Sequence, residues 1–206
     1  MLIVGLTGGI ATGKSLVSSY LKELGVYIID WDVITMEIEE PGMPAWQDVV
    51  NCFGKEILQK DGRLDRSKLG QIVFNDEAKR LKLNSFTHPR IIEEAKKQEK
   101  AIVESDPNAV VVHDVPLLFE VGIDKMVAKT VAVYATEEDQ IERLKTRDGM
   151  SRDDALSRIR SQMPPADKTK RADYVIDDSG SAEETKKQVQ ELYRKLVAMA
   201  HSPIRS

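Results

Sequence analysis

Residues 8–15 read Gly8-Gly9-Ile10-Ala11-Thr12-Gly13-Lys14-Ser15, which is the complete G-x-x-x-x-G-K-[ST] pattern of a phosphate-binding loop. The loop has the surroundings that this pattern requires: a short apolar run over residues 2–6 predicts a buried strand, and residues 16–24 carry apolar side chains at helical spacing. Glycines allow successive backbone N–H groups to point at a polyphosphate, and the following helix adds its positive N-terminal end. The pattern therefore predicts a nucleotide-binding site between a strand and a helix.

The positions of this loop have expected roles in binding ATP and Mg²⁺. We expect Lys14 to reach the β- and γ-phosphates and Ser15 to offer its hydroxyl to Mg²⁺. The backbone from Gly8 to Leu16 would surround the phosphates of ATP as an anion-binding nest. The alternative is a glycine-rich turn that fits by chance, which residue frequencies predict in on the order of one chain in a hundred of this length.

Composition bounds the class of protein. The 206 residues are 41% hydrophobic and 31% charged, with a net charge of −4, as in one compact domain with an ordinary core. No basic excess favours nucleic acid or an anionic membrane as a partner, and no apolar run approaches the roughly 18 residues of a membrane span. Cys52 is the only cysteine, so an internal disulfide is excluded, and Met1 is not followed by the pattern of a targeting segment. We therefore expect a cytoplasmic protein.

Two acidic residues follow the second predicted strand. The run over residues 26–30 predicts a strand that ends in Asp30, and Asp32 comes two residues later. Ligands of open α/β sheets bind outside the carboxyl ends of the strands, so Asp32 is a candidate to accept a proton from an attacking hydroxyl, with Asp30 beside it in the substrate site. Either residue could instead cap a helix over residues 33–38, and the sequence does not separate these interpretations.

The segment from about residue 32 to 107 is longer than a crossover between parallel strands needs. After a break at residues 41–44, the pattern predicts helices over residues 45–53, 65–74 and 76–103, the last interrupted near Thr87-His88-Pro89. Pro89 suits the first position of a helix, and this structural role competes with contacts of His88 and Arg90 to an acidic substrate. We interpret the segment as an inserted helical subdomain that holds the acceptor substrate.

Residues 109–114 predict a further buried strand, because the run is continuous and rich in valine. It ends in Asp114, as in a Walker B strand, whose carboxylate holds Mg²⁺ directly or through water. The apolar residues that follow include Leu117 and Leu118, which lie where a substrate is expected. Packing in the core explains these two leucines equally well.

A charged helical hairpin is predicted over about residues 141–167. Its first helix, over residues 137–147, carries Arg143 and Arg147; its second spans residues 151–162, and Pro164-Pro165 ends it. Such a hairpin is usually a solvated face, but after a phosphate-binding loop it also suits a lid that closes arginines over ATP. Residues 168–171 are then expected to lead into a strand over 173–177, a helix over 183–200 and a flexible tail over 201–206.

These patterns predict an α/β protein with the three-layer α/β/α architecture of phosphate-loop kinases and a parallel sheet. Residues 1–200 would form a single domain. Its core would comprise residues 1–31, 108–140 and 172–200, with the acceptor-binding insertion and the lid between these segments.

The order of the motifs resembles the dephospho-CoA kinase family, from about Leu2 to Met199. Beyond the phosphate-binding loop, the resemblance rests on Asp30-x-Asp32, His88-Pro89, Asp114-Val115-Pro116-Leu117-Leu118-Phe119-Glu120, Arg158-Ile159-x-x-Gln162 and Ala172-Asp173-x-Val175-Ile176-Asp177. The string D-V-P-L-L-F-E is far more specific than the loop. The resemblance implies an enzyme of coenzyme A biosynthesis that uses ATP and Mg²⁺ to phosphorylate the 3′-hydroxyl of the ribose of dephospho-CoA, as a monomer or weak homo-oligomer.

The resemblance also implies roles for individual residues. Asp32 matches the general base of the family, Asp114 lies beside the apolar shelf of Leu117 and Leu118 that faces the acceptor, and His88 belongs to the acceptor-binding subdomain. Arg143 and Arg147 match lid positions that neutralise the transferring phosphate together with Lys14.

Three residues depart from the family pattern. Leu16 replaces a common hydroxyl residue, Trp31 replaces a small residue, and Asp178 stands where asparagine is usual. We expect altered affinity rather than loss of activity. Two other functions stay open: a nucleoside or nucleoside-monophosphate kinase, and a nucleotide-dependent switch, although the chain has no N-K-x-D segment for reading guanine.

Overall fold

The computed structural model describes residues 1–74 and 76–201; position 75 and the predicted tail over 202–206 lie outside the described residues. The chain divides into two compact units. Unit 1 comprises residues 1–29 and 102–206, and unit 2 comprises residues 30–101. Unit 2 thus covers most of the segment that the sequence predicts as an insertion.

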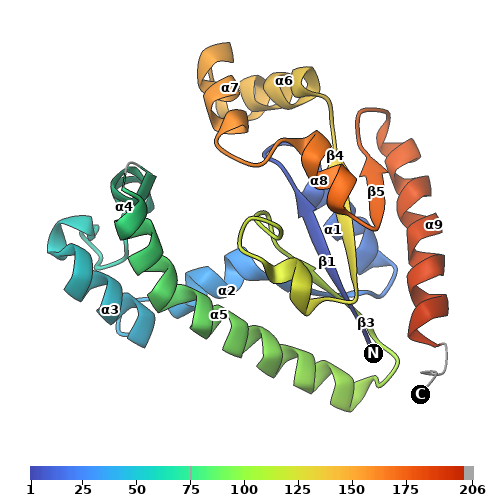
Figure 1. Ribbon diagram of the computed structural model, residues 1–206, viewed down its shortest axis with the longest axis horizontal. Helices are drawn as coiled ribbons and strands as arrows, with labels where there is room; N and C mark the ends of the chain where they lie inside the picture. The colour runs from blue at the N-terminus through green and yellow to red at the C-terminus, as the bar shows by residue number, and fades with distance from the viewer. Residues whose placement is uncertain (75, 202–206) are drawn as a thin grey trace. The chain divides into compact units, whose positions relative to one another are not determined.

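Unit 1 is built on a sheet whose strands are β1 (Leu2–Gly8), β2 (Tyr27–Asp30), β3 (Val110–Asp114), β4 (Lys129–Tyr134) and β5 (Tyr174–Asp177). Their order in the sheet is β2-β3-β1-β4-β5, and Figure 1 labels β1, β3, β4 and β5. The central strand β1 pairs in parallel with β3 and β4, and β4 pairs in parallel with β5. Because these strands run the same way, their carboxyl ends meet at one edge of the sheet, where the phosphate-binding loop begins.

Helices cover both faces of the sheet, as the alternation of side chains along β1 shows. Val4 and Leu6 belong to an apolar core that contains residues of α1 (Lys14–Glu23) and α9 (Ala182–Ala200). On the opposite face, Thr7 lies against α8 (Pro165–Arg171), and Leu118 packs on Gly5, where a β-carbon would fall 2.8 Å from a leucine methyl. The predicted α/β class with helices on both faces of a parallel sheet is confirmed.

The predicted charged hairpin consists of α6 (Glu137–Asp148) and α7 (Arg152–Arg160), which lie together in Figure 1. Thr136 and Ser151 cap these helices, and Gly149 ends α6 with a left-handed backbone, φ 65°. The hairpin has a small apolar core of its own, formed by Ile141, Leu144, Ala155 and Ile159, against which Ile10 and Ala11 pack. The hairpin is therefore packed against the phosphate-binding loop through apolar side chains.

Unit 2 is helical. It contains α2 (Trp31–Ile38), α3 (Pro44–Phe53), the short 3₁₀ helix η1 (Lys55–Ile57), α4 (Arg66–Phe74) and most of α5 (Glu77–Ser105); a second 3₁₀ helix, η2 (Ile123–Met126), lies in unit 1. Its apolar core consists of Val49, Val50, Phe53, Ile57, Leu64 and Leu69. Unit 2 also contains an ion pair of 2.8 Å between Arg66 and the buried Glu39. Burial raises the pKa of Glu39 although Arg66 opposes this shift.

Two predictions about helix boundaries are wrong. The sequence predicts a break near Pro89, but α5 continues through it and holds Pro89 in its interior. In this part of α5, Thr87 donates to the carbonyl of Leu83 and Arg90 donates to the carbonyl of Phe86. The second error concerns residues 165–171, which form α8 with Pro165 in its first turn instead of a link into β5.

Candidate nucleotide-binding site

The loop between β1 and α1 has the backbone of an anion-binding nest. Ala11 and Gly13 have positive φ angles of 57° and 89°, and Ala11 is the only non-glycine residue with positive φ in the part of the chain that the structure describes. No side chain caps the start of α1, and its first turn has no acidic residue. The positive end of the helix is therefore available to a phosphate.

Lys14 and Asp114 form an ion pair at the edge of the sheet where the loop begins. Strand register explains the encounter, since Asp114 at the end of β3 lies beside Leu6 of β1. Both side chains are largely enclosed, with 16% and 4% of their surfaces exposed, so their attraction is weakly screened. Ser15 lies exposed in the same first turn of α1. Parallel pairing of β1 and β3 thus brings the phosphate-binding loop and the strand that ends in Asp114 together.

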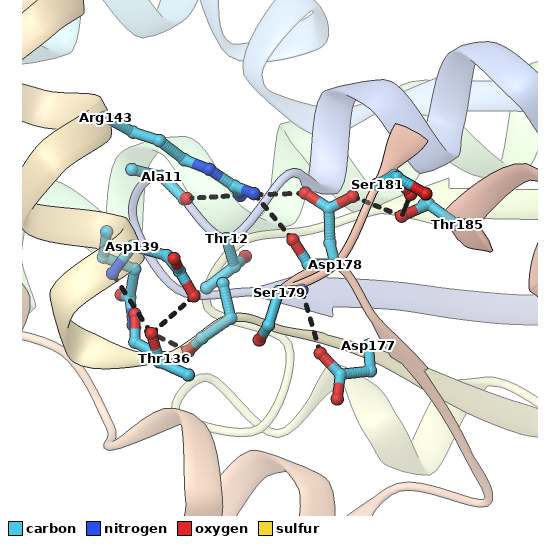
Figure 2. A network of polar contacts seen from close by, with 12 residues as sticks. Ala11, Thr12, Thr136, Asp139, Arg143, Asp177, Asp178, Ser179, Ser181 and Thr185 are labelled. Carbon is cyan, nitrogen blue, oxygen red and sulfur yellow. Dashed lines mark hydrogen bonds and ion pairs between the residues drawn. The ribbon is translucent and has the colours of Figure 1, made fainter. Parts of the chain in front are cut away.

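Arg143 joins α6 to the phosphate-binding loop, as Figure 2 shows. Its Nη1 donates to the carbonyl of Ala11 at 3.1 Å and to Oδ2 of Asp178 at 2.8 Å, and its Nη2 donates to the carbonyl of Asp178 at 2.6 Å. The buried Asp178 also accepts from the Thr185 hydroxyl at 2.6 Å. Charge-assisted bonds of this kind are strong and directional. Asp178 is therefore part of a framework beneath the loop, together with Arg143 and Thr185.

Arg147 lies in a different environment from Arg143, although both belong to α6. Its guanidinium makes two hydrogen bonds of 2.8 Å to Asp148, and 63% of its side chain is exposed. The hydrogen bonds to Asp148 raise the pKa of Arg147. The structure thus places Arg143 against the loop and Arg147 at the solvated end of the helix.

Two residues that the sequence patterns did not assign to the site reach the loop or its neighbours. Gln162, just after α7, accepts a hydrogen bond of 2.9 Å from the backbone N–H of Ile10. Lys168 of α8 has 1% of its side chain exposed and contacts the segment after β3. Gln162 stands in the segment Arg158-Ile159-x-x-Gln162, on which the family resemblance partly rests. For Lys168 the sequence predicts only a position in the link to β5, and no local pattern indicates its burial.

The apolar segment after Asp114 divides into buried and exposed residues. Leu118 is fully buried over Gly5, which favours the core-packing interpretation for it, whereas Leu117 is 40% exposed and stays a candidate for substrate contact. His113 is also buried, and burial lowers its pKa to about 4. His113 is therefore neutral at physiological pH and belongs to the interior of the sheet.

In unit 2, the structure distinguishes Asp30 from Asp32. The Asp30 carboxylate caps α2 by accepting hydrogen bonds from the backbone N–H groups of Asp32 at 2.9 Å and Val33 at 3.2 Å. Asp32 occupies the first turn and is exposed. The capping role therefore falls to Asp30 and leaves Asp32 as the candidate base.

The predicted acceptor-contacting residues of α5 are partly engaged within unit 2. His88 is half-buried, and burial lowers its pKa. Arg90 forms an ion pair of 2.7 Å with Asp48 of α3. The histidine, rather than the arginine, stays the candidate for substrate contact here.

These features define the phosphate-loop class of nucleotide-dependent phosphotransferases. They are a phosphate nest at the carboxyl ends of parallel strands, a lysine paired with the aspartate of the neighbouring strand, and a hairpin that carries arginines. Within this class, the chain belongs to the dephospho-CoA kinase family, whose model matches residues 2–184.

Comparison with individual proteins agrees with this membership. A dephospho-CoA kinase from Carboxydothermus hydrogenoformans is 51% identical over 94% of this chain and 93% of its own length, and one from Bacillus cereus is 46% identical over 92% and 94%. Among solved structures, a Thermus thermophilus protein has a TM-score of 0.80 at 30% identity, covering 95% of this chain and 97% of its own. A dephospho-CoA kinase from Campylobacter jejuni has a TM-score of 0.68 at 28% identity, covering 96% and 98%.

Proposed function

We propose that this protein transfers the γ-phosphoryl group of ATP to the 3′-hydroxyl of the ribose of dephospho-CoA, which yields coenzyme A and ADP. The observation that supports this most directly is the Lys14–Asp114 pair at the mouth of the phosphate nest, in a chain of the dephospho-CoA kinase family. Transfer between oxygen atoms asks the protein mainly for positioning and charge stabilisation.

The nest and Lys14 would hold the phosphates. Backbone N–H groups of the loop other than those of Ile10 and Thr12, which donate to Gln162 and Gly9, would bind the β-phosphate. The ammonium of Lys14, which has three donors, can contact Asp114 and the γ-phosphate at once. Leu16 offers no hydroxyl, so the α-phosphate would depend on backbone contacts. Arg143 would act through its bonds to Ala11 and Asp178, and Arg147 would approach the phosphates only when the hairpin moves.

Asp32 would accept the proton of the attacking hydroxyl. A carboxylate is one of the side chains that serve as general bases in proton transfer. Asp30 would position it, because its bonds to the N–H groups of Asp32 and Val33 fix the first turn of α2. His88 and Leu117 would contact the acceptor.

Ser15 and Asp114 would hold Mg²⁺. Their hydroxyl and carboxylate oxygens are the ligands that Mg²⁺ prefers, and it commonly takes only one or two groups from the protein. Within residues 1–74 and 76–201, no three or more histidine, cysteine, aspartate or glutamate side chains form a group that could hold a metal ion. When bound, Mg²⁺ neutralises charge on the β- and γ-phosphates.

We also propose that the protein works in the cytoplasm as a monomer or weak homo-oligomer, with small molecules rather than nucleic acid as its partners. The single cysteine and the net charge of −4 support this proposal. In the described part of the chain, no helix is both long and apolar enough to cross a membrane.

An acceptor panel tests the proposal. Purified protein is given Mg²⁺ and ATP with dephospho-CoA, a nucleoside, a nucleoside monophosphate or no acceptor, and ADP and the phosphorylated product are measured by mass. We expect ADP and coenzyme A in equal amounts with dephospho-CoA, and neither from Lys14→Met. ADP formed with a nucleotide acceptor instead would overturn the proposed substrate, and ADP release that is independent of any acceptor would overturn the kinase assignment.

A further inference from the structure

Lys168 is a buried lysine whose ammonium contacts two other segments of unit 1. Its Nζ donates to the carbonyl of Pro116 at 2.6 Å, lies 2.9 Å from Oε1 of Glu120, and lies 3.5 Å from the hydroxyl of Thr7. Thr7 donates to the same Pro116 carbonyl at 2.9 Å. One carbonyl thus receives both a hydroxyl and an ammonium, so α8, the end of β1 and the segment after β3 meet at one point.

These contacts lie directly beside the groups that handle phosphate. Thr7 immediately precedes Gly8, the first glycine of the phosphate-binding loop, and Pro116 follows two residues after Asp114, the partner of Lys14. A change in the distance between Thr7 and Pro116 would therefore shift the loop relative to Asp114. Lys168 contacts both segments, because its Nζ donates to the carbonyl of Pro116 and lies near the hydroxyl of Thr7.

Glu120 extends the cluster to the hairpin. Besides Lys168, its carboxylate accepts a hydrogen bond of 3.2 Å from the backbone N–H of Met163, one residue after Gln162. Gln162 in turn accepts from the N–H of Ile10. The segment by which the chain leaves the α6–α7 hairpin is thus bonded on one side to Glu120 and on the other to the phosphate-binding loop.

A buried ammonium is costly unless it is paired, and Glu120 provides the pairing. Burial lowers the pKa of Lys168, the bond to Glu120 opposes this shift, and the nearby charge of Lys14 lowers the pKa further. An apolar side chain of the same length would fill the space of Lys168 without joining these segments.

We infer that Lys168 is a positioning residue for phosphoryl transfer: with Glu120, it holds the turn after Asp114 against β1 and fixes the exit of the hairpin, so that Lys14, Asp114 and the hairpin keep their places around ATP. This inference rests on the proposed roles of Lys14, Asp114 and the hairpin. Lys168 is buried, and its Nζ is bonded to protein groups. We therefore expect it to affect phosphoryl transfer through the position of the residues that it contacts.

Lys168→Met tests the inference, with Lys168→Arg as the conservative variant and Lys170→Met as the matched control on the same helix, where the Lys170 side chain is 76% exposed. We expect Lys168→Met to lower kcat roughly tenfold or more, with KM for dephospho-CoA changed by less than about threefold. Lys168→Arg should recover most of kcat, and Lys170→Met should match the wild type. Folding of each variant is checked by its thermal unfolding midpoint.

A second measurement is independent of the acceptor. Hydrogen exchange of α6 and α7 is followed with and without a non-hydrolysable ATP analogue and Mg²⁺. We expect the analogue to slow exchange in the wild type and in Lys170→Met, but to slow it much less in Lys168→Met. If dephospho-CoA proved to be the wrong acceptor, this difference would remain, so failure of the proposed function and failure of the inference are distinguishable.

Glu120→Gln provides a second route should Lys168→Met fold poorly, because glutamine keeps an acceptor for both Lys168 and Met163. We expect it to lower kcat in the same direction, and the double variant to be no slower than the slower single variant, as for two residues that act as a unit. Folded variants with wild-type kcat, wild-type KM and undiminished protection by the analogue would overturn the inference and leave Lys168 a stabilising residue only.

Discussion

The carboxylate of Asp178 lies against Gly13 of the phosphate-binding loop, where a β-carbon would fall 2.0 Å from Oδ2. The backbone of Gly13 also has a φ of 89°, which side chains other than hydrogen rarely allow. Two separate constraints therefore favour glycine at position 13: its positive φ and the close approach of Asp178, which is bonded to Arg143. This contact determines how closely the framework beneath the loop can approach it.

Gly13→Ala should abolish detectable binding of an ATP analogue and lower stability. The methyl group would displace Asp178 and weaken its bonds to Arg143, in addition to a backbone strain of about 1 kcal/mol or more. Gly25→Ala is the matched control, because Gly25 has the same φ of 89° with nothing within 4 Å of its β-carbon position. Calorimetric titration and thermal unfolding measure both effects. Equal analogue affinities of the two variants would contradict the role given to the Asp178 contact.

Asp178→Asn and Asp178→Ala should differ. Asparagine keeps an acceptor for Thr185 or Arg143, so we expect a loss of about 1 kcal/mol in the free energy of unfolding. Alanine leaves the guanidinium of Arg143 with fewer partners, and we expect a loss of about 2–3 kcal/mol together with weaker ATP binding. Urea unfolding and titration with an ATP analogue provide the measurements. Two variants of equal stability would show that the carboxylate is not what holds Arg143.

Asp32→Asn should lower kcat by about 10²–10⁴-fold and leave the affinity for ATP nearly unchanged, because it removes a proton acceptor and not a phosphate ligand. Asp30→Asn is its companion, since asparagine still caps α2 and should keep most of the activity. Asp30→Ala should cost about 1 kcal/mol of stability through the lost cap. Steady-state kinetics and analogue binding separate these effects, and unchanged turnover in Asp32→Asn would exclude Asp32 as the base.

His113 should make the protein less stable as pH falls. Its pKa is lowered by burial to about 4, whereas an unfolded chain has its histidines near the ordinary value of 6.5. Between about pH 6.5 and pH 4, His113 is protonated in the unfolded state but largely neutral in the folded state, so the free energy of unfolding falls as the pH falls. Between pH 7 and pH 5, His113 alone should lower the free energy of unfolding by about 2 kcal/mol.

The control for this effect is His113→Gln, which cannot titrate. Urea unfolding of both proteins at pH 7 and pH 5 isolates the histidine, because other groups, such as Glu39, contribute equally to each. We expect the wild type to lose more stability than the variant over this interval. Parallel losses in the two proteins would mean that the pKa of His113 is not lowered in the folded state.

Local pattern was sufficient for the parts of this protein that depend on neighbouring residues. The strand before Gly8 and the helix after Gly13 follow from short-range apolar spacing, and Asp30 was correctly among the possible caps because capping acts over three residues. The valine-rich run that ends in Asp114 was correctly predicted as a buried strand for the same reason. These features identified a phosphate-loop protein before any contact was known.

Tertiary contacts determined the rest. α5 runs through Pro89, although proline removes one backbone hydrogen bond from a helix, and the neighbouring Arg90 is bonded to Asp48, 42 positions away in the chain. Lys168 is buried because Pro116 and Glu120 surround it, although it lies 52 and 48 positions away from them in the chain. Arg143, predicted from the family resemblance as a lid residue, is bonded to Asp178, 35 positions away. A side chain's partners across such distances depend on how strands and helices pack, so sequence alone determined the class of site, and the fold decided which residues form its framework.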